Sequence, residues 1–185
     1  MKKIARFYTF LLVALVSFTF VSCDEDDEIA YTLEGTWRGN MYMSHGYGDY
    51  EYSSTYSEIC FLRDPYAYSS GNGYWVDYYS RAPWDYIANH IEWTVSNGVI
   101  KVYFVEERAY VDIYDYSLSD NYFTGTLYDK GYPVDFSLTH VSSPNWNDYE
   151  WGWDYWSSAR QSMMKKSNGV PFKADEKPVR RVRRI

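Results

Sequence analysis

The stretch His90–Phe104, HIEWTVSNGVIKVYF, alternates apolar and polar residues on both sides of an Asn-Gly pair. Side chains of a β-strand point alternately to its two faces, so Ile91, Trp93 and Val95 would share one face. An Asn-Gly pair between two such runs is the strongest short-range signal for a β-hairpin. The stretch therefore predicts two antiparallel strands joined by a two-residue turn.

The same period of two continues on both sides of this hairpin. Turn residues separate further runs, which we predict as strands: Thr36–Met43, Tyr50–Leu62, Tyr74–Tyr79, Val111–Ile113, Phe123–Leu127 and Val134–Leu138. Aromatic residues make up 21% of the chain, and tyrosine favours half-buried sheet surfaces. A meander of eight strands with one apolar face closes into a barrel, since closure removes both sheet edges. We therefore predict an all-β fold, an eight-stranded antiparallel up-and-down barrel over residues 33–141.

Two short motifs add a family resemblance. GTW, Gly35–Trp37, at the start of the first strand resembles the signature of lipocalins and other calycins. GNG, Gly71–Gly73, resembles a strand start common in lipocalin-like lipoproteins of Bacteroidetes. The resemblance implies a barrel whose closed end is plugged by Trp37 and whose lumen binds a small apolar or amphipathic ligand. At the end of the last strand, where the family carries Arg or Lys to stack on this tryptophan, the chain has His140.

The N-terminus resembles a lipoprotein signal. Basic residues at positions 2, 3 and 6 precede an apolar run, Phe7–Val21, whose length of about 15 residues falls short of the roughly 20 that span a bilayer. The segment Phe20–Cys23, FVSC, then resembles a bacterial lipobox. This implies that residues 1–22 are a lipoprotein signal peptide and that Cys23 becomes the lipidated first residue.

Five acidic residues follow that cysteine and resemble the tract that marks surface lipoproteins of Bacteroidetes for export: Asp24, Glu25, Asp26, Asp27 and Glu28. The resemblance implies an outer-membrane protein that is lipid-anchored and exposed on the cell surface. The alternative is a solvated spacer that only repels phosphate head groups. In both readings residues 23–32 form an acidic tether, and the membrane is a partner through the N-terminal lipid.

We predict a C-terminal helix over residues 142–168. Ser143 would cap the helix and Pro144 would take its first position. An aromatic stripe would pack this helix against the barrel wall, as in lipocalins: Trp146, Tyr149, Trp153 and Trp156.

The chain ends in a basic segment, residues 169–185, which is too polar and charged to pack and which we predict to be a disordered tail. Residues 159–185 carry a net charge of +7, against −17 for residues 23–158. The tail would therefore fold back onto the acidic barrel or contact anionic lipid phosphates, and we slightly favour the lipid.

Several function classes are disfavoured. The chain contains no catalytic, phosphate-binding or dinucleotide-binding motif, and its acidic body argues against nucleic acid as a partner. His45 and His90 would lie at one end of the barrel and His140 at the other, which leaves at most a histidine pair with a carboxylate for zinc. Cys60 has no disulfide partner once Cys23 is lipidated. We predict a monomeric, non-catalytic protein without a cofactor or metal.

Two functions remain open. The first is a carrier that binds a small apolar or amphipathic ligand in the barrel lumen. The second is a surface module that binds a glycan or a protein through two aromatic loops, Ser44–Asp49 and Ser80–Asn89, because tyrosine and tryptophan rings stack on sugars. A structural subunit of an outer-membrane complex is a variant of the second. The candidate ligand-binding residues are His45, Tyr47, Trp84, Tyr86 and His90.

Overall fold

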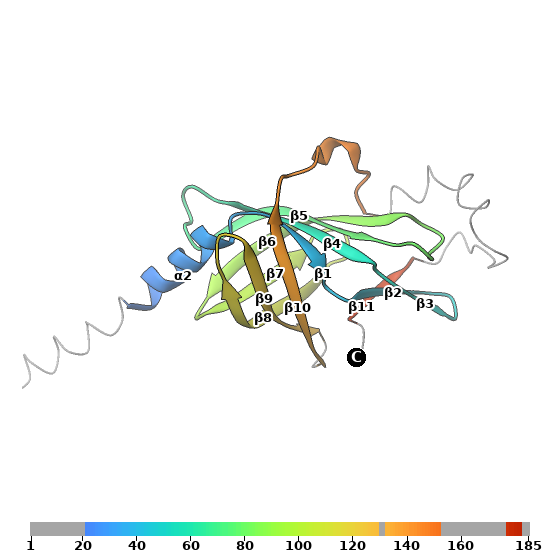
Figure 1. Ribbon diagram of the computed structural model, residues 1–185, viewed down its shortest axis with the longest axis horizontal. Helices are drawn as coiled ribbons and strands as arrows, with labels where there is room; N and C mark the ends of the chain where they lie inside the picture. The colour runs from blue at the N-terminus through green and yellow to red at the C-terminus, as the bar shows by residue number, and fades with distance from the viewer. Residues whose placement is uncertain (1–20, 130–131, 153–176, 183–185) are drawn as a thin grey trace, which may run out of the picture.

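The computed structural model describes residues 21–129, 132–152 and 177–182. Its body is a closed barrel of eight antiparallel strands, as the sequence predicts (Figure 1). The barrel closes because its first strand, β1, pairs with both β10 and β4. The strands are β1 Gly35–Asn40, β4 Tyr56–Arg63, β5 Ser70–Tyr78, β6 Tyr86–Ser96, β7 Val99–Phe104, β8 Ala109–Leu118, β9 Tyr122–Asp129 and β10 Tyr132–Val141.

A second, smaller sheet lies at one end of the barrel. Its strands are ordered β11-β2-β3, with bounds β2 Met43–Tyr47, β3 Tyr50–Ser53 and β11 Val179–Val182. A helix, α2 Val21–Leu33, lies at the opposite end (Figure 1). We call the end near α2 the closed end and the end near the small sheet the mouth.

The hairpin predicted within residues 90–104 is formed by β6 and β7. The two strands pair from Ser96 opposite Val99 to Ile91 opposite Phe104. The two turn residues, Asn97 and Gly98, have φ angles of 52° and 71°. A two-residue hairpin turn of this kind requires positive φ at both positions, which Asn and Gly tolerate best. Local turn chemistry and strand period therefore agree at this hairpin.

Large aromatic side chains fill the closed end of the barrel. Trp37 is fully buried, lies edge-on to Phe123 at 5.7 Å, and donates its indole N–H to the carbonyl oxygen of Leu33 at 2.8 Å. At the same end, Phe61 lies edge-on to Trp93 at 5.6 Å. Aromatic pairs prefer this edge-to-face geometry, which adds to the free energy gained by burial. Trp37 thus occupies the plugging position that the lipocalin resemblance implies.

Residues 23–32 belong to helix α2, which corrects the prediction of a tether. Ala30 and Leu33 are fully buried against the barrel, and apolar residues at positions 29, 30 and 33 give the helix one packing face. The Asp26 carboxylate accepts two backbone N–H groups of the β6–β7 turn, both at 2.9 Å. The acidic tract therefore lies in a helix that docks on the barrel.

The predicted strands Thr36–Met43 and Tyr50–Leu62 are each interrupted. β1 ends at Asn40, whose side-chain oxygen accepts the backbone N–H of Tyr42 at 2.7 Å, and Tyr42 has a φ of 55°. The chain leaves the barrel here, forms the hairpin of β2 and β3, and returns in β4. The period of two runs through both breaks, so it could not reveal them.

The described part of the predicted C-terminal helix is not an α-helix. Its helical residues are a short 3-10 helix, η1 Trp146–Asp148, capped by Asn145. The predicted cap, Ser143, instead shares a hydrogen bond with the hydroxyl of Thr36 at 2.5 Å. Gly152 adopts a φ of 59°, a left-handed conformation that interrupts an α-helix. The remainder of the predicted helix, with Trp153 and Trp156, lies outside the described residues.

This segment nevertheless packs on the barrel wall. The Trp146 ring stacks on Tyr74 at a centroid distance of 4.9 Å, and the Tyr149 hydroxyl is hydrogen-bonded to that of Tyr78. The predicted aromatic packing on the barrel wall is therefore present, but it is made by an irregular segment and not by a helix.

Part of the predicted disordered tail is ordered. Strand β11 pairs with β2, and Arg180 within it is only 5% exposed. Its charge is neutralised by carboxylates inside the barrel, which the composition of the tail alone does not reveal. No helix among the described residues is long and apolar enough to cross a membrane.

Trp37→Ala should destabilise the protein by about 3–5 kcal/mol, because it removes a buried ring and leaves a cavity at the closed end. The free energy of unfolding, measured by chemical denaturation, checks this. Tyr66→Ala is the control, since Tyr66 is 91% exposed. A loss below about 1 kcal/mol would contradict the assignment of Trp37 as a core plug.

Candidate ligand-binding site

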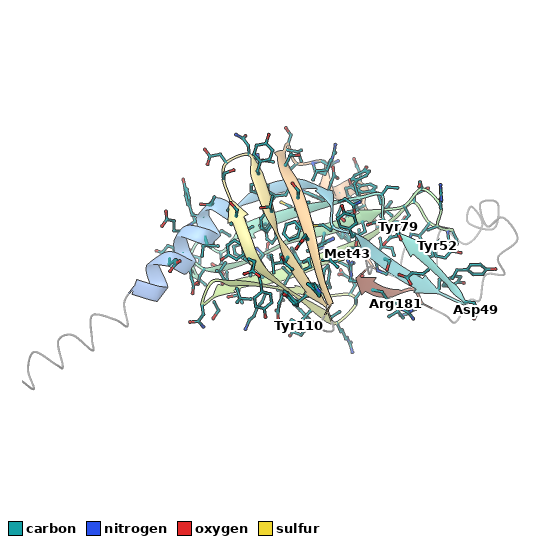
Figure 2. The ribbon with its side chains drawn as sticks, turned by 60° about the horizontal axis from the view of Figure 1, so that its bottom comes forward. Met43, Asp49, Tyr52, Tyr79, Tyr110 and Arg181 are labelled. Atoms are coloured by element: carbon teal, nitrogen blue, oxygen red, sulfur yellow. The ribbon has the colours of Figure 1, made fainter. Side chains whose placement is uncertain are left out.

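Buried polar and charged side chains gather at the mouth of the barrel. Figure 2 shows Tyr79 and Arg181 at this end, away from α2. Three of these side chains come from barrel strands, one from the β7–β8 turn, one from the loop after β5, and two from the small sheet. We call this set the mouth cluster: Ser57, Asp77, Asn89, Glu107, Tyr79, His45 and Arg180.

Strand parity places polar residues at the mouth end of the lumen. Asp77 lies two residues after the buried Trp75 on β5, and Asn89 lies two residues before the buried Ile91 on β6. Residues two apart share a face of a strand, so Asp77 and Asn89 face the lumen as the apolar residues do. Ser57 stands opposite Asp77 in the β4–β5 pair. The lumen therefore changes from aromatic at the closed end to polar at the mouth.

Arg180 is the only cation in the mouth cluster, and it bridges the two carboxylates. One terminal nitrogen, Nη1, donates to Asp77 Oδ2 at 2.7 Å, while Nε and Nη2 donate to the two oxygens of Glu107, both at 2.9 Å. The guanidinium carbon lies 4.0 Å from the ring centroid of Phe104, within cation–π range. Burial alone would lower the pKa of Arg180, but the two carboxylates raise it above its ordinary value. Arg180 is therefore a charged group held in an aromatic and anionic socket.

The barrel orients both carboxylates independently of the tail. Asp77 Oδ1 accepts the hydroxyl of Ser57 at 2.5 Å and the indole N–H of Trp75 at 3.0 Å. Glu107 Oε1 accepts the amide N–H of Asn89 at 2.8 Å. The other Asn89 amide atom, Oδ1, is buried and has no hydrogen-bond partner among the described residues. Such an acceptor suits a ligand that brings a donor.

His45 joins the small sheet to this cluster. Its Nδ1 lies 2.5 Å from the Tyr79 hydroxyl and its Nε2 lies 3.4 Å from Glu107 Oε1. Burial lowers the pKa of His45, and the hydrogen bond with Glu107 only partly opposes this. A neutral ring that faces a carboxylate carries its proton on Nε2, so Nδ1 accepts the Tyr79 hydroxyl proton. Two carboxylates, one guanidinium and a neutral histidine leave a formal charge of −1 in the cluster.

The pKa of Glu107 is also lowered. Burial alone would raise the pKa of its carboxyl, but the Arg180 guanidinium and the His45 hydrogen bond lower it below the ordinary range. The Glu107 carboxylate is thus held in its ionised form at neutral pH. An ionised, water-poor anionic site binds cations more strongly than a surface carboxylate does.

The structure brings together three of the five residues predicted to bind ligand. His45 belongs to the mouth cluster, and Tyr47 and Trp84 are buried beside it, with ring centroids 6.0 Å apart. Tyr86 and His90 lie elsewhere, on the outer face of β6. Tyr47 and Trp84 of the two predicted loops therefore face inward and do not offer stacking surfaces to solvent.

Two of these residues contact the segment after β10. The Tyr86 hydroxyl accepts the backbone N–H of Glu150 at 3.0 Å. The His90 ring lies 4.2 Å from that of Trp151, and its Nδ1 is 2.5 Å from Glu106 Oε1. Tyr86 and His90 therefore help to hold the segment after β10 on the barrel wall.

His140 lies apart from His45, as strand direction predicts, whereas His90 lies on the outer face of β6 and not beside His45. His140 lies at the closed end, opposite Trp37 in the β1–β10 pair, with ring centroids 5.0 Å apart. It takes the place where the family carries Arg or Lys. In the described part of the chain, no group of three His, Cys, Asp or Glu residues could hold a metal ion. Cys60 is buried and free, and burial raises the pKa of its thiol.

Sequence reasoning missed the three charged residues of the cluster. Asp77 stands in the run YWVDY at a position whose parity faces the core, which is a signal that could have been read. Glu107 lies in a turn and Arg180 in a basic segment, where charges are ordinarily solvated. Their pairing depends on chain crossings that no local pattern encodes.

Two open grooves border the mouth and the wall. One, of about 550 Å³, lies between residues 106–111 and residues 177–180. The other, of about 480 Å³, lies on the outer wall of β5–β8. Its lining includes Asn72, Glu92, Lys101, Tyr103 and Tyr110.

Acidification should destabilise the protein through His45. Because burial lowers its folded-state pKa, the unfolded chain binds the proton first, and stability present above the ordinary histidine pKa of about 6.5 is lost as pH falls. At about pH 5.5 this loss is at most about 1.4 kcal/mol, the full contribution of a group whose unfolded-state pKa is about 6.5. Unfolding free energies across this range check it. His45→Gln should flatten the dependence, with His140→Gln as control, and an unchanged slope in His45→Gln would contradict the assignment.

A comparison with protein families agrees with this architecture. A family model described as a lipocalin-like domain matches residues 33–125, which run from the last residue of α2 into β9. No curated protein matches the chain. The matched span covers half of the 185 residues and most of the closed barrel. The chain therefore belongs to the lipocalin-like family.

Proposed function

We propose that this chain is a non-catalytic lipoprotein of the outer membrane, anchored at Cys23 and exposed on the cell surface, whose barrel binds a small amphipathic ligand at its mouth. The observation that carries the proposal is the mouth cluster, a buried anionic site directly above an apolar lumen. Apolar and polar surfaces that adjoin in this way suit a ligand with an apolar body and a polar head.

The ligand would bind at the mouth and not deep in the barrel. Trp37, Phe61 and Phe123 occupy the closed end and contact one another. An eight-stranded barrel is narrow enough for its own side chains to fill. The groove of about 550 Å³ beside Arg180 has the volume of a small-molecule site. We therefore expect the ligand between the β7–β8 turn and residues 177–180.

The charges of the cluster favour a cationic head. The mouth cluster has a formal charge of −1 even with Arg180 in place. The Asn89 Oδ1 acceptor has no hydrogen-bond donor among the described residues. An ammonium or guanidinium group supplies both a positive charge and N–H donors, whereas a carboxylate supplies neither. We therefore expect the site to prefer amphipathic amines over fatty acids.

The docked helix supports the orientation of the proposed anchor. Helix α2 begins at Val21 and packs on the closed end through Ala30 and Leu33. A lipid on Cys23 would be attached within about one helical turn of Asp26, which is bonded to the β6–β7 turn. The closed end would then face the membrane and the mouth would face away from it.

A glycan-binding module is the second candidate, and the groove on the outer wall favours it. The Tyr103 and Tyr110 rings lie 4.6 Å apart there, and Tyr110 is 67% exposed. Such rings can stack on the C–H faces of a sugar while Asn72 and Glu92 bond its hydroxyls. The inward-facing aromatic loops do not support this function, so the candidate surface moves to the wall.

The ligand preference can be measured on residues 23–185 with Cys23→Ser. By calorimetry, dodecylamine should bind at least about tenfold more tightly than dodecanoate, since each 1.4 kcal/mol of charge preference is a factor of ten. Asn89→Ala should weaken amine binding, whereas Asn72→Ala on the outer wall should leave it unchanged. Equal affinity for the two probes would contradict the mouth site, and glycan binding that is lost only in Asn72→Ala would favour the wall groove.

The anchor is tested by fractionation. Cys23→Ala should move the protein from the outer-membrane fraction to the soluble fraction, because each methylene of the lost acyl chains contributes about 0.8 kcal/mol to membrane binding. Immunoblots of separated fractions check this. Tyr66→Ala, an exposed position outside the anchor segment, is the control. Membrane retention of the Cys23→Ala protein would contradict the proposal.

A further inference from the structure

We propose that the barrel mouth recognises an arginine presented on an extended peptide segment, and that the chain's own strand β11 occupies this site in the structure. The inference rests on the proposed function in taking the mouth as a binding site. It narrows the polar head of the ligand to a guanidinium and adds a backbone contact. The site therefore has two parts, a socket for one side chain and a strand edge.

The strand edge is provided by β2. β11 adds to it antiparallel, with Arg180 opposite His45 and Arg181 opposite Ser44. The Ser44 hydroxyl donates to the carbonyl oxygen of Arg181 at 2.9 Å. Addition of a strand to an exposed sheet edge is a general mode of peptide recognition, in which main-chain bonds supply affinity and alternate side chains supply specificity. The hairpin of β2 and β3 offers that edge outside the barrel.

The socket belongs to the barrel and not to the tail. Asp77 is held by Ser57 and Trp75, and Glu107 by Asn89, all of which lie far from β11 in the chain. Without a cation, two carboxylates would remain buried next to each other, which is strongly unfavourable. A preformed anionic socket of this kind requires an occupant of positive charge.

The geometry selects arginine among cations. Three guanidinium nitrogens bond three different carboxylate oxygens, and the planar group lies over the Phe104 ring. A lysine ammonium is a point charge without this fork, so it cannot reproduce the paired bonds to Glu107. The socket therefore recognises the shape of the guanidinium as well as its charge.

Among the strand positions whose burial is described, 179 to 181, only Arg180 enters the socket. Arg180 is buried in the socket, whereas Arg181 and Val179 are exposed. This alternation follows from the period of two in a strand. The neighbouring arginine consequently provides a matched control, because it shares the charge and the strand of Arg180 and differs only in the face.

The experiment uses the full mature chain and a labelled peptide of residues 177–185, KPVRRVRRI. In fluorescence anisotropy, the Arg180→Ala chain should bind the peptide about 10- to 100-fold more tightly than the unchanged chain, whose own strand competes. The Arg181→Ala chain should behave like the unchanged chain. A peptide carrying Arg180→Ala should lose binding to the Arg180→Ala chain, while one carrying Arg181→Ala should keep it.

A second measurement guards against misfolding of the Arg180→Ala chain. Millimolar N-ethylguanidinium should raise its unfolding temperature, whereas ethylammonium should raise it less and the unchanged chain should not respond. The Arg180→Lys chain, which keeps a cation in the socket, should fold and bind the peptide with a smaller gain. Equal losses from the two peptide substitutions, or absence of any guanidinium response, would overturn the inference. Dodecylamine binding that persists in that case would leave the proposed function standing.

Discussion

Two carboxylates buried at the mouth of a β-barrel require a cation, and this electrostatic constraint organises that end of the molecule. Asp77 and Glu107 are both buried, and Arg180 bridges them from the far end of the chain. Taking three charges out of water costs several kcal/mol per ion, so a well-packed apolar cluster of the same volume would often be as stable or more stable. The cluster is therefore poorly explained as a device for stability. It is better explained as a means of specifying one partner geometry, because only a guanidinium at that place satisfies both carboxylates.

The two ends of the barrel use the same strands for opposite purposes. At the closed end, inward positions carry Trp37 and Phe123, and α2 seals the barrel with Leu33. At the mouth, the inward positions of β5 and β6 carry Asp77 and Asn89. Strand parity guarantees that all these side chains share one lumen, so a change of residue type along a strand becomes a change of polarity along the barrel axis. A helix therefore covers the apolar closed end, and the small sheet, whose β2 edge pairs with β11, lies at the polar mouth.

The barrel could be predicted from the sequence because its signals are local. The period of two and the Asn97-Gly98 turn are properties of neighbouring residues, and both are found in β6 and β7. Helix α2 and strand β11 were missed because charge dominates their composition, and charged segments are ordinarily solvated. What orders them is distant: Asp26 bonds to a turn about 70 residues away, and Arg180 to a carboxylate about 100 residues away. The candidate site shares this limit, since its exposed-looking aromatic loops are buried by the same small sheet that carries His45.

Magnitudes decide between the two partners that the sequence left open for the basic tail. An arginine near an anionic membrane surface gains about 1 kcal/mol, and that gain is screened within about 8 Å at physiological salt. Removing Arg180 from the mouth would leave Asp77 and Glu107 buried without a counter-charge, at a cost of about 3–5 kcal/mol. The membrane cannot compensate for that loss one arginine at a time, and Arg181 already faces solvent while β11 is in place. A lipid surface could therefore recruit the exposed arginine without competing for the buried one. Only a ligand that brings its own cation into the socket can exchange with Arg180, so the charge of the occupant determines whether Arg180 can leave the two carboxylates.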